Sequence, residues 1–213
     1  MSLILFDFDG VLADTLADML RFAQDTCAEL GIHRIVTAAD LDALETMSFA
    51  EYGIQLGVPF PLADEFAIRC LEKFAQKPSP PAMFAGMAQV IQQLSARHVI
   101  GIVTGNTSRT VENFLVGNGI RKYVSAVFAV DQPGSKAEKS LKAQRQLAKP
   151  NEEVFFVGDS VSDIHAAQET SIKSIAVSWG HQSLDRLIPA KPDFIVHSPE
   201  EIIEVVENRR RVR

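Results

Sequence analysis

The sequence predicts an α/β fold: a parallel β-sheet covered by helices on both faces, with a helical segment inserted after the first strand. Short apolar runs rich in β-branched residues alternate with amphipathic helical patterns over residues 83–213, which is the order of elements in a parallel sheet. The runs are apolar at almost every position, as expected of strands that are buried on both faces. Residues 14–82 break the alternation, because they show helical patterns only.

The composition is that of an ordinary folded protein with a substantial core. The chain has 213 residues, of which 46% are hydrophobic and 23% are charged, and its formal net charge is −6. A surface of this sign gives no support to binding of nucleic acid or of an anionic membrane. No apolar run is long enough to span a membrane and no signal peptide is recognisable, so we expect a cytoplasmic protein. We interpret the C-terminal cations as a solvated helix end: Arg209, Arg210, Arg211 and Arg213.

The strands and helices of the sheet follow one another along the chain. Strands are predicted at residues 3–8, 99–104, 126–130, 154–158 and 174–178, with a weaker sixth at 193–196. Helices are predicted at residues 86–97, 108–119, 136–148, 162–170 and 199–210.

The inserted segment is predicted to be helical throughout. Apolar residues recur at spacings of three and four in residues 13–31 and again in residues 61–76. Cys27 and Cys70 lie in these apolar patterns, so we expect buried free thiols. The proline-rich stretch KPSPPAMF then leads back to the sheet. We therefore expect two domains, one formed by residues 1–13 and 83–213 and the other by residues 14–82.

Acidic side chains follow two of the predicted strands. Asp7 and Asp9 end the first strand at alternate positions, so their side chains should lie on the same side. Asp159 comes directly after the fourth strand, and Asp163 follows four residues later at the start of a helix. Ligands bind at the carboxyl ends of parallel strands. We therefore expect four carboxylates to converge there.

Such a cluster requires a cation. Two like charges about 4 Å apart repel by roughly 4 kcal/mol at an effective dielectric constant near 20. Mg²⁺ is the natural partner, because it prefers carboxylate oxygens together with water and phosphate. Zinc is not expected, since these motifs contain no histidine or cysteine.

A phosphate-binding region is predicted at the end of the second strand. Thr104 supplies a hydroxyl group there, and the amides of Gly105 and Asn106 begin a turn into a helix, which is a favourable place for an anion. A lysine is also needed, and the stretch GSKAEK offers two. Four ionised carboxylates and a phosphate dianion would exceed the charge of one Mg²⁺ and one lysine. One carboxyl group should therefore be protonated, and a neutral Asp9 would be a general acid.

These motifs resemble those of the haloacid dehalogenase-like hydrolases. DFDGVLADT, IVTGN, a lysine upstream of the fourth strand, and VGDSVSD occur here in the order of that family. The resemblance implies a Rossmann-like core, and it implies that residues 14–82 form a type 1 cap. The C-terminal part, with a Trp-Gly pair, a Pro-Asp pair and a late acidic helix, is similar to the phosphoglycolate phosphatase-like branch.

The resemblance also implies a reaction. Asp7 would attack the phosphorus atom and form an aspartyl-phosphate, while Asp9 would protonate the leaving alcohol and later activate water. Mg²⁺ would be held by Asp7, by the backbone carbonyl of Asp9 and by Asp159, with Asp163 binding directly or through water.

The phosphoryl oxygens would be held by the second motif and the lysine. Thr104, Gly105 and Asn106 form the first part of this site. Lys136 is preferred over Lys139 as the lysine because it opens its predicted helix, although the Lys-Pro pair common in the family is absent.

The substrate is expected to be a small organic phosphomonoester, with 2-phosphoglycolate as the family-based candidate. A phosphomutase would carry the same motifs, and a phosphate-binding signalling module without turnover is a third possibility. A dehalogenase is disfavoured by Asp9. Candidate selectivity residues lie around Met47 to Tyr52. The histidines are expected at the surface or in the core, and among them only His181, beside Trp179 and Gly180, is a candidate for contact with the substrate. Nothing in the sequence indicates an oligomeric state.

Overall fold

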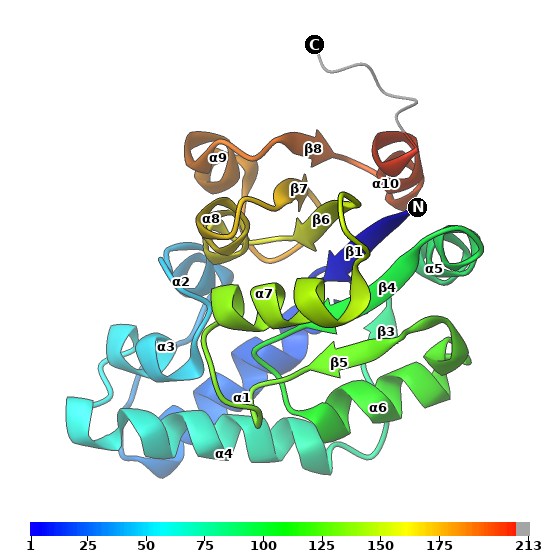
Figure 1. Ribbon diagram of the computed structural model, residues 1–213. Helices are drawn as coiled ribbons and strands as arrows, with labels where there is room; N and C mark the ends of the chain where they lie inside the picture. Colours follow the sequence, from blue (N-terminus) through cyan, green and yellow to red (C-terminus); the bar gives the residue numbers. More distant parts are fainter. Residues whose placement is uncertain (208–213) are drawn as a thin grey trace.

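The core of the molecule is a six-stranded parallel sheet. The computed structural model describes residues 1–207, and the basic tail and the end of the predicted helix 199–210 lie outside them. The strand order is β5-β4-β1-β6-β7-β8 (Figure 1). The strands are β1 (Ser2–Phe6), β4 (Val99–Val103), β5 (Ala126–Phe128), β6 (Glu153–Gly158), β7 (Lys173–Val177) and β8 (Phe194–Val196). All six predicted strands are confirmed, including the weak sixth.

Helices cover both faces of this sheet, as predicted. One face carries α5 (Met87–Ser95), α6 (Ser108–Gly117) and α10 (Pro199–Val206), and the other carries α7 (Lys136–Leu147) and α8 (Val161–Glu169). The short elements η2 (Arg121–Tyr123), α9 (Leu184–Leu187) and η3 (Ile188–Ala190) complete this Rossmann-like part of the chain.

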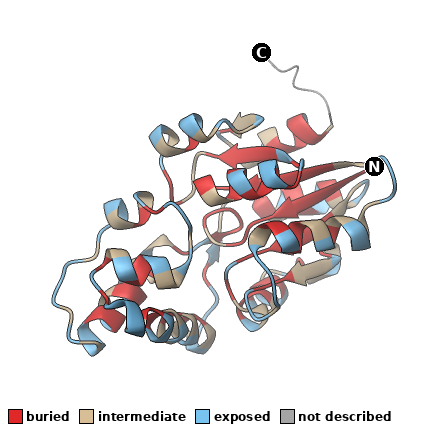
Figure 2. Cartoon of the chain, turned by 60° about the vertical axis from the view of Figure 1, so that its left-hand side comes forward, coloured by how far each residue is buried: buried red, intermediate tan, exposed pale blue. Residues whose placement is uncertain are grey.

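The central strand shows how the sequence pattern specifies these layers. Ile4 and Phe6 belong to the hydrophobic cluster under α5, α6 and α10. Leu3 and Leu5 point the opposite way, into the cluster under α7 and α8. Successive strand residues face opposite sides, so an apolar residue at every position produces a strand that is buried on both faces, as Figure 2 shows for the middle of the sheet.

The helices between Leu16 and Gln76, called the helical unit from here on, share a hydrophobic cluster of their own. Its elements are α1 (Leu16–Glu29), α2 (Ala38–Asp42), α3 (Phe49–Gln55), η1 (Phe60–Leu62) and α4 (Ala63–Gln76). Buried side chains of this cluster include Phe22, Tyr52 and Phe66, together with the free thiols of Cys27 and Cys70. None of these residues belongs to the clusters of the sheet.

The expectation of helix throughout this unit was wrong. Residues 32–37 and 43–48 are not helical. Gly31 follows α1 with φ of 76°, a left-handed conformation that ends helices. The side chain of Ser48 accepts a hydrogen bond from the amide of Glu51 and so starts α3 as a new helix.

The chain enters and leaves the helical unit through a second, two-stranded sheet that the sequence did not predict. β2 (Ala13–Asp14) pairs in antiparallel fashion with β3 (Ala82–Met83), with Ala13 opposite Met83. The outgoing and returning segments are therefore hydrogen-bonded neighbours.

No helix within residues 1–207 is long and apolar enough to cross a membrane.

Candidate active site

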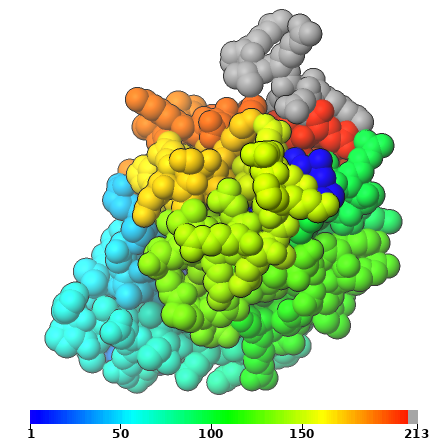
Figure 3. Space-filling view, viewed as in Figure 1, coloured from blue at the N-terminus to red at the C-terminus, as the bar shows by residue number. Residues whose placement is uncertain are grey.

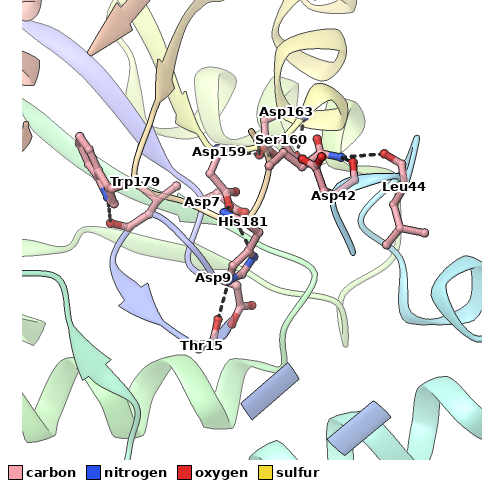
Figure 4. A network of polar contacts seen from close by, with 12 residues as sticks. Asp7, Asp9, Thr15, Asp42, Leu44, Asp159, Ser160, Asp163, Trp179 and His181 are labelled. Carbon is pink, nitrogen blue, oxygen red and sulfur yellow. Dashed lines mark hydrogen bonds and ion pairs between the residues drawn. The ribbon is translucent and has the colours of Figure 1, made fainter. Parts of the chain in front are cut away.

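Three buried carboxyl groups meet at the carboxyl ends of β1 and β6. Ligand oxygens of Asp7, Asp159 and Asp163 all lie within 4.8 Å of one another (Figure 4). The amide of Asp7 donates a 2.8 Å hydrogen bond to the carbonyl of Val157, which extends the pairing of β1 with β6 by one residue. Adjacent parallel strands thus bring together two motifs that are far apart in the sequence.

Asp163 is held rigidly at the start of α8. Its Oδ2 accepts hydrogen bonds from the Ser160 hydroxyl at 2.6 Å and from the amides of Asp159 and Ser160 at 3.2 and 3.1 Å. Its Oδ1 accepts from Nζ of Lys136 at 2.5 Å. Both oxygens of this carboxylate are therefore already engaged by donors of the chain.

Lys136, the first residue of α7, is the cation inside this cluster. Besides Asp163, its Nζ lies 3.3 Å from Oδ1 of Asp7. Burial lowers the pKa of Lys136, but the carboxylates of Asp163 and Asp7 outweigh burial and raise it above the ordinary value, so the side chain stays charged. The alternative, Lys139, forms no ion pair with these carboxylates among the described residues.

Burial and the neighbouring carboxylates raise the pKa values of Asp7 and Asp159. Burial raises the pKa of Asp7 well above its usual value, with further contributions from Asp163 and Asp159. Burial and the neighbouring Asp163 also raise the pKa of Asp159 to about 7. Oδ1 of Asp7 is buried and accepts no hydrogen bond within residues 1–207, although Lys136 is close. A hard cation would satisfy these oxygens.

Asp9 lies beside the cluster and not within it. The regular strand ends at Phe6, and Asp9 is not one of the three residues whose ligand oxygens all lie within 4.8 Å of one another. The side chain of Asp9 accepts from Nδ2 of Asn106 at 3.2 and 3.4 Å. Burial raises its pKa, opposed by His181 and by hydrogen bonds from Asn106 and Thr15. The charge of Asp9 nevertheless raises the pKa of Asp7, and the charge of Asp159 raises the pKa of Asp9, so the four carboxyl groups interact with one another.

The second motif forms a tight turn after β4. Oγ1 of Thr104 accepts from the amide of Asn106 at 2.9 Å, and both side chains are buried. Gly105 is exposed towards the helical unit, where its nearest neighbour is the carbonyl of Met47. The turn therefore presents a hydroxyl, an open backbone and an amide side chain next to Asp9.

His181 reaches the site from the loop after β7. Its amide donates to Oδ2 of Asp159 at 2.7 Å, its Nδ1 lies 3.4 Å from the same oxygen, and its Nε2 is 3.3 Å from Oγ1 of Thr15. Burial lowers the pKa of His181. A Cβ atom on Gly180 would collide with Asp159, so only glycine permits this close approach. His181 therefore positions Asp159 and faces Thr15, at the start of α1.

A cavity of about 590 Å³ extends from this site between the sheet and the helical unit. The helical unit contributes Met47, Phe49 and Leu71 to its wall, and the other side contributes Lys136 and the two motif residues Thr104 and Gly105. The surface of the helical unit adjoins that of α7 (Figure 3). The expected segment beginning at Met47 thus lines the cavity.

Three further polar side chains of the helical unit and α8 lie in different places. Arg69 pairs with Glu65 and Glu29, and Lys73 pairs with Glu29, so both form surface ion pairs outside the cavity wall. His165 does line the cavity. Its sequence context gave no signal, because only the position of α8 beside the site brings it there.

Polar contacts also join the helical unit to the loop after His181. Nε2 of Gln182 donates to the carbonyl groups of Asp42 and Leu44 at 2.9 and 2.7 Å. Arg186 donates to Glu45 at 2.6 Å. These contacts hold the end of α2 and the residues after it against the loop that follows β7. The sequence did not indicate them, since they join residues that are distant in the chain.

Comparison with known proteins places the chain in a family. A phosphoglycolate phosphatase from Synechococcus elongatus is 28% identical over 99% of this chain and 100% of its own length. An N-acetylmuramic acid 6-phosphate phosphatase from Pseudomonas aeruginosa is 27% identical over 97% of this chain and 95% of its own length. A haloacid dehalogenase-like hydrolase from Streptococcus pneumoniae has a similar structure, with a TM-score of 0.81, 21% identity, and coverage of 96% of this chain and 98% of that one.

The family model described as haloacid dehalogenase-like hydrolase matches residues 4–177. This range begins within β1, contains the whole helical unit and ends with β7. It includes Asp7, Lys136 and the buried acidic pair that follows β6. The chain therefore belongs to the haloacid dehalogenase-like hydrolases.

Proposed function

We propose that this phosphoric monoester hydrolase cleaves small organic phosphates with Mg²⁺ through a phosphorylated Asp7. The observation that supports this best is the buried set of Asp7, Asp159 and Asp163 around Lys136, a residue that also lines the cavity under the helical unit. A carboxylate nucleophile, a site for a hard cation and a lysine for the phosphoryl oxygens are the parts that this reaction requires.

The residues fit Mg²⁺. The donor set is made of carboxylate oxygens, and Oδ1 of Asp7 is buried without a hydrogen bond from the described residues. Asp7 and Asp159 would bind the ion directly. Asp163 would act through water, since donors of the chain occupy both of its oxygens. When bound, Mg²⁺ would offset the negative charge of the phosphoryl group and of the cluster.

Asp7 and Asp9 would divide the chemistry between them. An oxygen of Asp7 forms the new bond to phosphorus as the bond to the leaving oxygen breaks, and Asp9 gives that oxygen its proton. Burial raises the pKa of Asp9, which favours the protonated form that this step needs. In the second half of the reaction, ionised Asp9 removes a proton from the water that attacks the phosphorus atom and releases phosphate.

The turn of residues 104–106 and Lys136 would hold the phosphoryl oxygens. The exposed backbone of Gly105 leaves room for an anion, and Thr104 and Lys136 border the same cavity. Asn106 would keep Asp9 in place through its amide group. These donors are fixed before the substrate binds, which is the condition for effective stabilisation of developing charge.

The helical unit would serve as a cap of residues 14–82 over a core of residues 1–13 and 83–213. It closes the cavity from the side opposite Lys136 and supplies mainly apolar side chains there. A closed cap excludes water during formation of the aspartyl-phosphate and selects the leaving group. The Synechococcus relative makes 2-phosphoglycolate the first substrate to test.

Turnover of p-nitrophenyl phosphate tests the proposal. We expect Mg²⁺-dependent release of inorganic phosphate by the unmodified chain and none above background by Asp7→Asn. Asp25→Asn, a change at an exposed position of α1, is the matched control and should retain full activity. Mass spectrometry of acid-quenched enzyme should detect a phosphorylated peptide containing residue 7.

Product analysis with phosphate esters that carry a second hydroxyl group separates the alternatives. Transfer of phosphate between two positions of a substrate without release of inorganic phosphate would indicate a phosphomutase. A stable phosphorylated chain without turnover would indicate a signalling module. Full activity of Asp7→Asn would refute the proposed nucleophile.

A further inference from the structure

Lys139 is a buried cation that the proposed reaction does not use. Its exposed fraction is 6%, and it lines the same cavity as Lys136. Within residues 1–207 its side chain has neither a hydrogen bond nor an ion pair, and its Nζ is not among the fully buried polar atoms. The aliphatic stem is therefore buried while the charged end stays accessible, as is usual for long cationic side chains.

No neighbouring group supplies the missing partner. Asp131 attracts Lys139, but its carboxylate accepts hydrogen bonds from the amide and hydroxyl of Ser108, both at 2.9 Å. Burial lowers the pKa of Lys139 despite that attraction. Lys136 is engaged with Asp7 and Asp163. The ammonium group of Lys139 is thus available to whatever fills the cavity.

The position of Lys139 relates it to the proposed phosphoryl site. Lys136 and Lys139 are three residues apart on α7, so their side chains are neighbours on one face of the helix. Lys136 contacts the proposed nucleophile, and Lys139 lies about one turn farther along the cavity wall. A group bound by Lys139 would therefore share the cavity with the phosphoryl group but contact a different cation.

The rest of the wall offers no equivalent cation. The helical unit presents Met47, Phe49 and Leu71. Glu45 is exposed and pairs with Arg186 at 2.6 Å, and Glu169 is exposed as well. Apart from Lys136, Lys139 is the one buried cationic side chain among the described residues that line this cavity.

We propose that Lys139 binds a second anionic group of the substrate. This inference rests on the proposed phosphatase function. It defines the preferred substrates as phosphomonoesters whose leaving group carries a carboxylate or a further phosphate a few bonds from the ester oxygen. The apolar side chains of the cap would contact the carbon skeleton between the two anions.

Three substrates and three variants test this. Ethyl phosphate, 2-phosphoglycolate and 1,2-ethanediol bisphosphate share a two-carbon leaving group and end in a methyl group, a carboxylate and a phosphate respectively. Lys139→Met removes the charge, and Lys139→Arg keeps it. Lys142→Met removes an exposed cation of the same helix outside the cavity wall and is the matched control.

We expect the unmodified enzyme to have a kcat/KM at least about tenfold higher for one of the two anionic substrates than for ethyl phosphate. Lys139→Met should lower kcat/KM for that substrate by about 10- to 100-fold, the usual range for loss of a charge-assisted hydrogen bond, and for ethyl phosphate by less than about threefold. Lys139→Arg should retain most of the preference, and Lys142→Met all of it. Which anionic substrate responds identifies the second anion.

The outcomes separate this inference from the proposed function. Turnover of all three substrates at similar kcat/KM by the unmodified enzyme would overturn the inference alone, and that comparison needs no variant to fold. An equal loss on all substrates in Lys139→Met would overturn it as well. Absence of turnover on every phosphomonoester would instead refute the proposed function.

Discussion

The acidic cluster should make the metal-free protein less stable as the pH rises. Asp159 is 1% exposed, and burial together with Asp163 raises its pKa from 3.8 to about 7. Between these values the folded protein binds a proton that the unfolded chain has lost, so the free energy of unfolding falls with increasing pH. A tenfold change in a proton equilibrium is worth about 1.4 kcal/mol, so the loss attributable to this carboxyl group is about 4 kcal/mol.

Asp159→Asn tests this magnitude. The asparagine stays neutral at every pH, and its side-chain oxygen can still accept the hydrogen bond from the amide of His181. Urea unfolding followed by circular dichroism, in EDTA from pH 4 to pH 8, should show near-equal stability at pH 4. The variant should then become more stable than the unmodified protein by about 4 kcal/mol at pH 8.

Addition of Mg²⁺ should narrow the difference in stability between the two proteins at pH 8. Binding to the folded state alone stabilises by about 2.7 kcal/mol when the free ion is a hundred times its dissociation constant, and Asp159→Asn should lose most of this gain. Asp25→Asn, at an exposed position, should follow the unmodified protein throughout. Parallel stability curves for Asp159→Asn and the unmodified protein in EDTA would refute the electrostatic reasoning.

Two further substitutions test the residues that hold the acidic cluster in place. Lys136→Met leaves Asp7 and Asp163 buried without their cation and should lower the free energy of unfolding at pH 8 by about 3–5 kcal/mol; unchanged urea unfolding would contradict this. Gly180→Ala places a Cβ atom against Asp159 and should lower the free energy of unfolding by about 1–3 kcal/mol. It should also weaken the binding of Mg²⁺, which calorimetry measures. Retention of the unmodified Mg²⁺ affinity would show that the loop of His181 does not position Asp159.

The layers of the sheet were predictable because burial on both faces leaves a strong signal. β1 is apolar from Leu3 to Phe6, and no solvent-facing strand would tolerate this pattern. The pair of β2 and β3 was not predictable, since each strand has two residues and neither shows a periodicity. The helices of the helical unit end and begin at local signals such as Gly31 and the cap at Ser48. The spacing of apolar residues over a long segment does not show these signals.

The site was predictable where a motif directly follows a strand. Asp7 and Asp159 are positioned by the pairing of β1 with β6 and lie together as expected. Asp9 lies beyond the end of the strand, and its nearest partner, Asn106, comes from the turn after β4. His181 and Gln182 come from the loop after β7, and only the strand order places that loop next to β6. Strand order depends on long-range packing, which the spacing of residues along the chain does not encode.

The antiparallel pairing of Ala13 with Met83 has a consequence for how this family can change. Because the outgoing and returning segments pair with each other, the chain between them can be exchanged as one unit or replaced by a two-residue hairpin turn. Neither change alters the register of the large sheet. Recombination at this ribbon would replace the cap side of the cavity in a single genetic event while Asp7, Lys136 and the acidic pair after β6 stay in place.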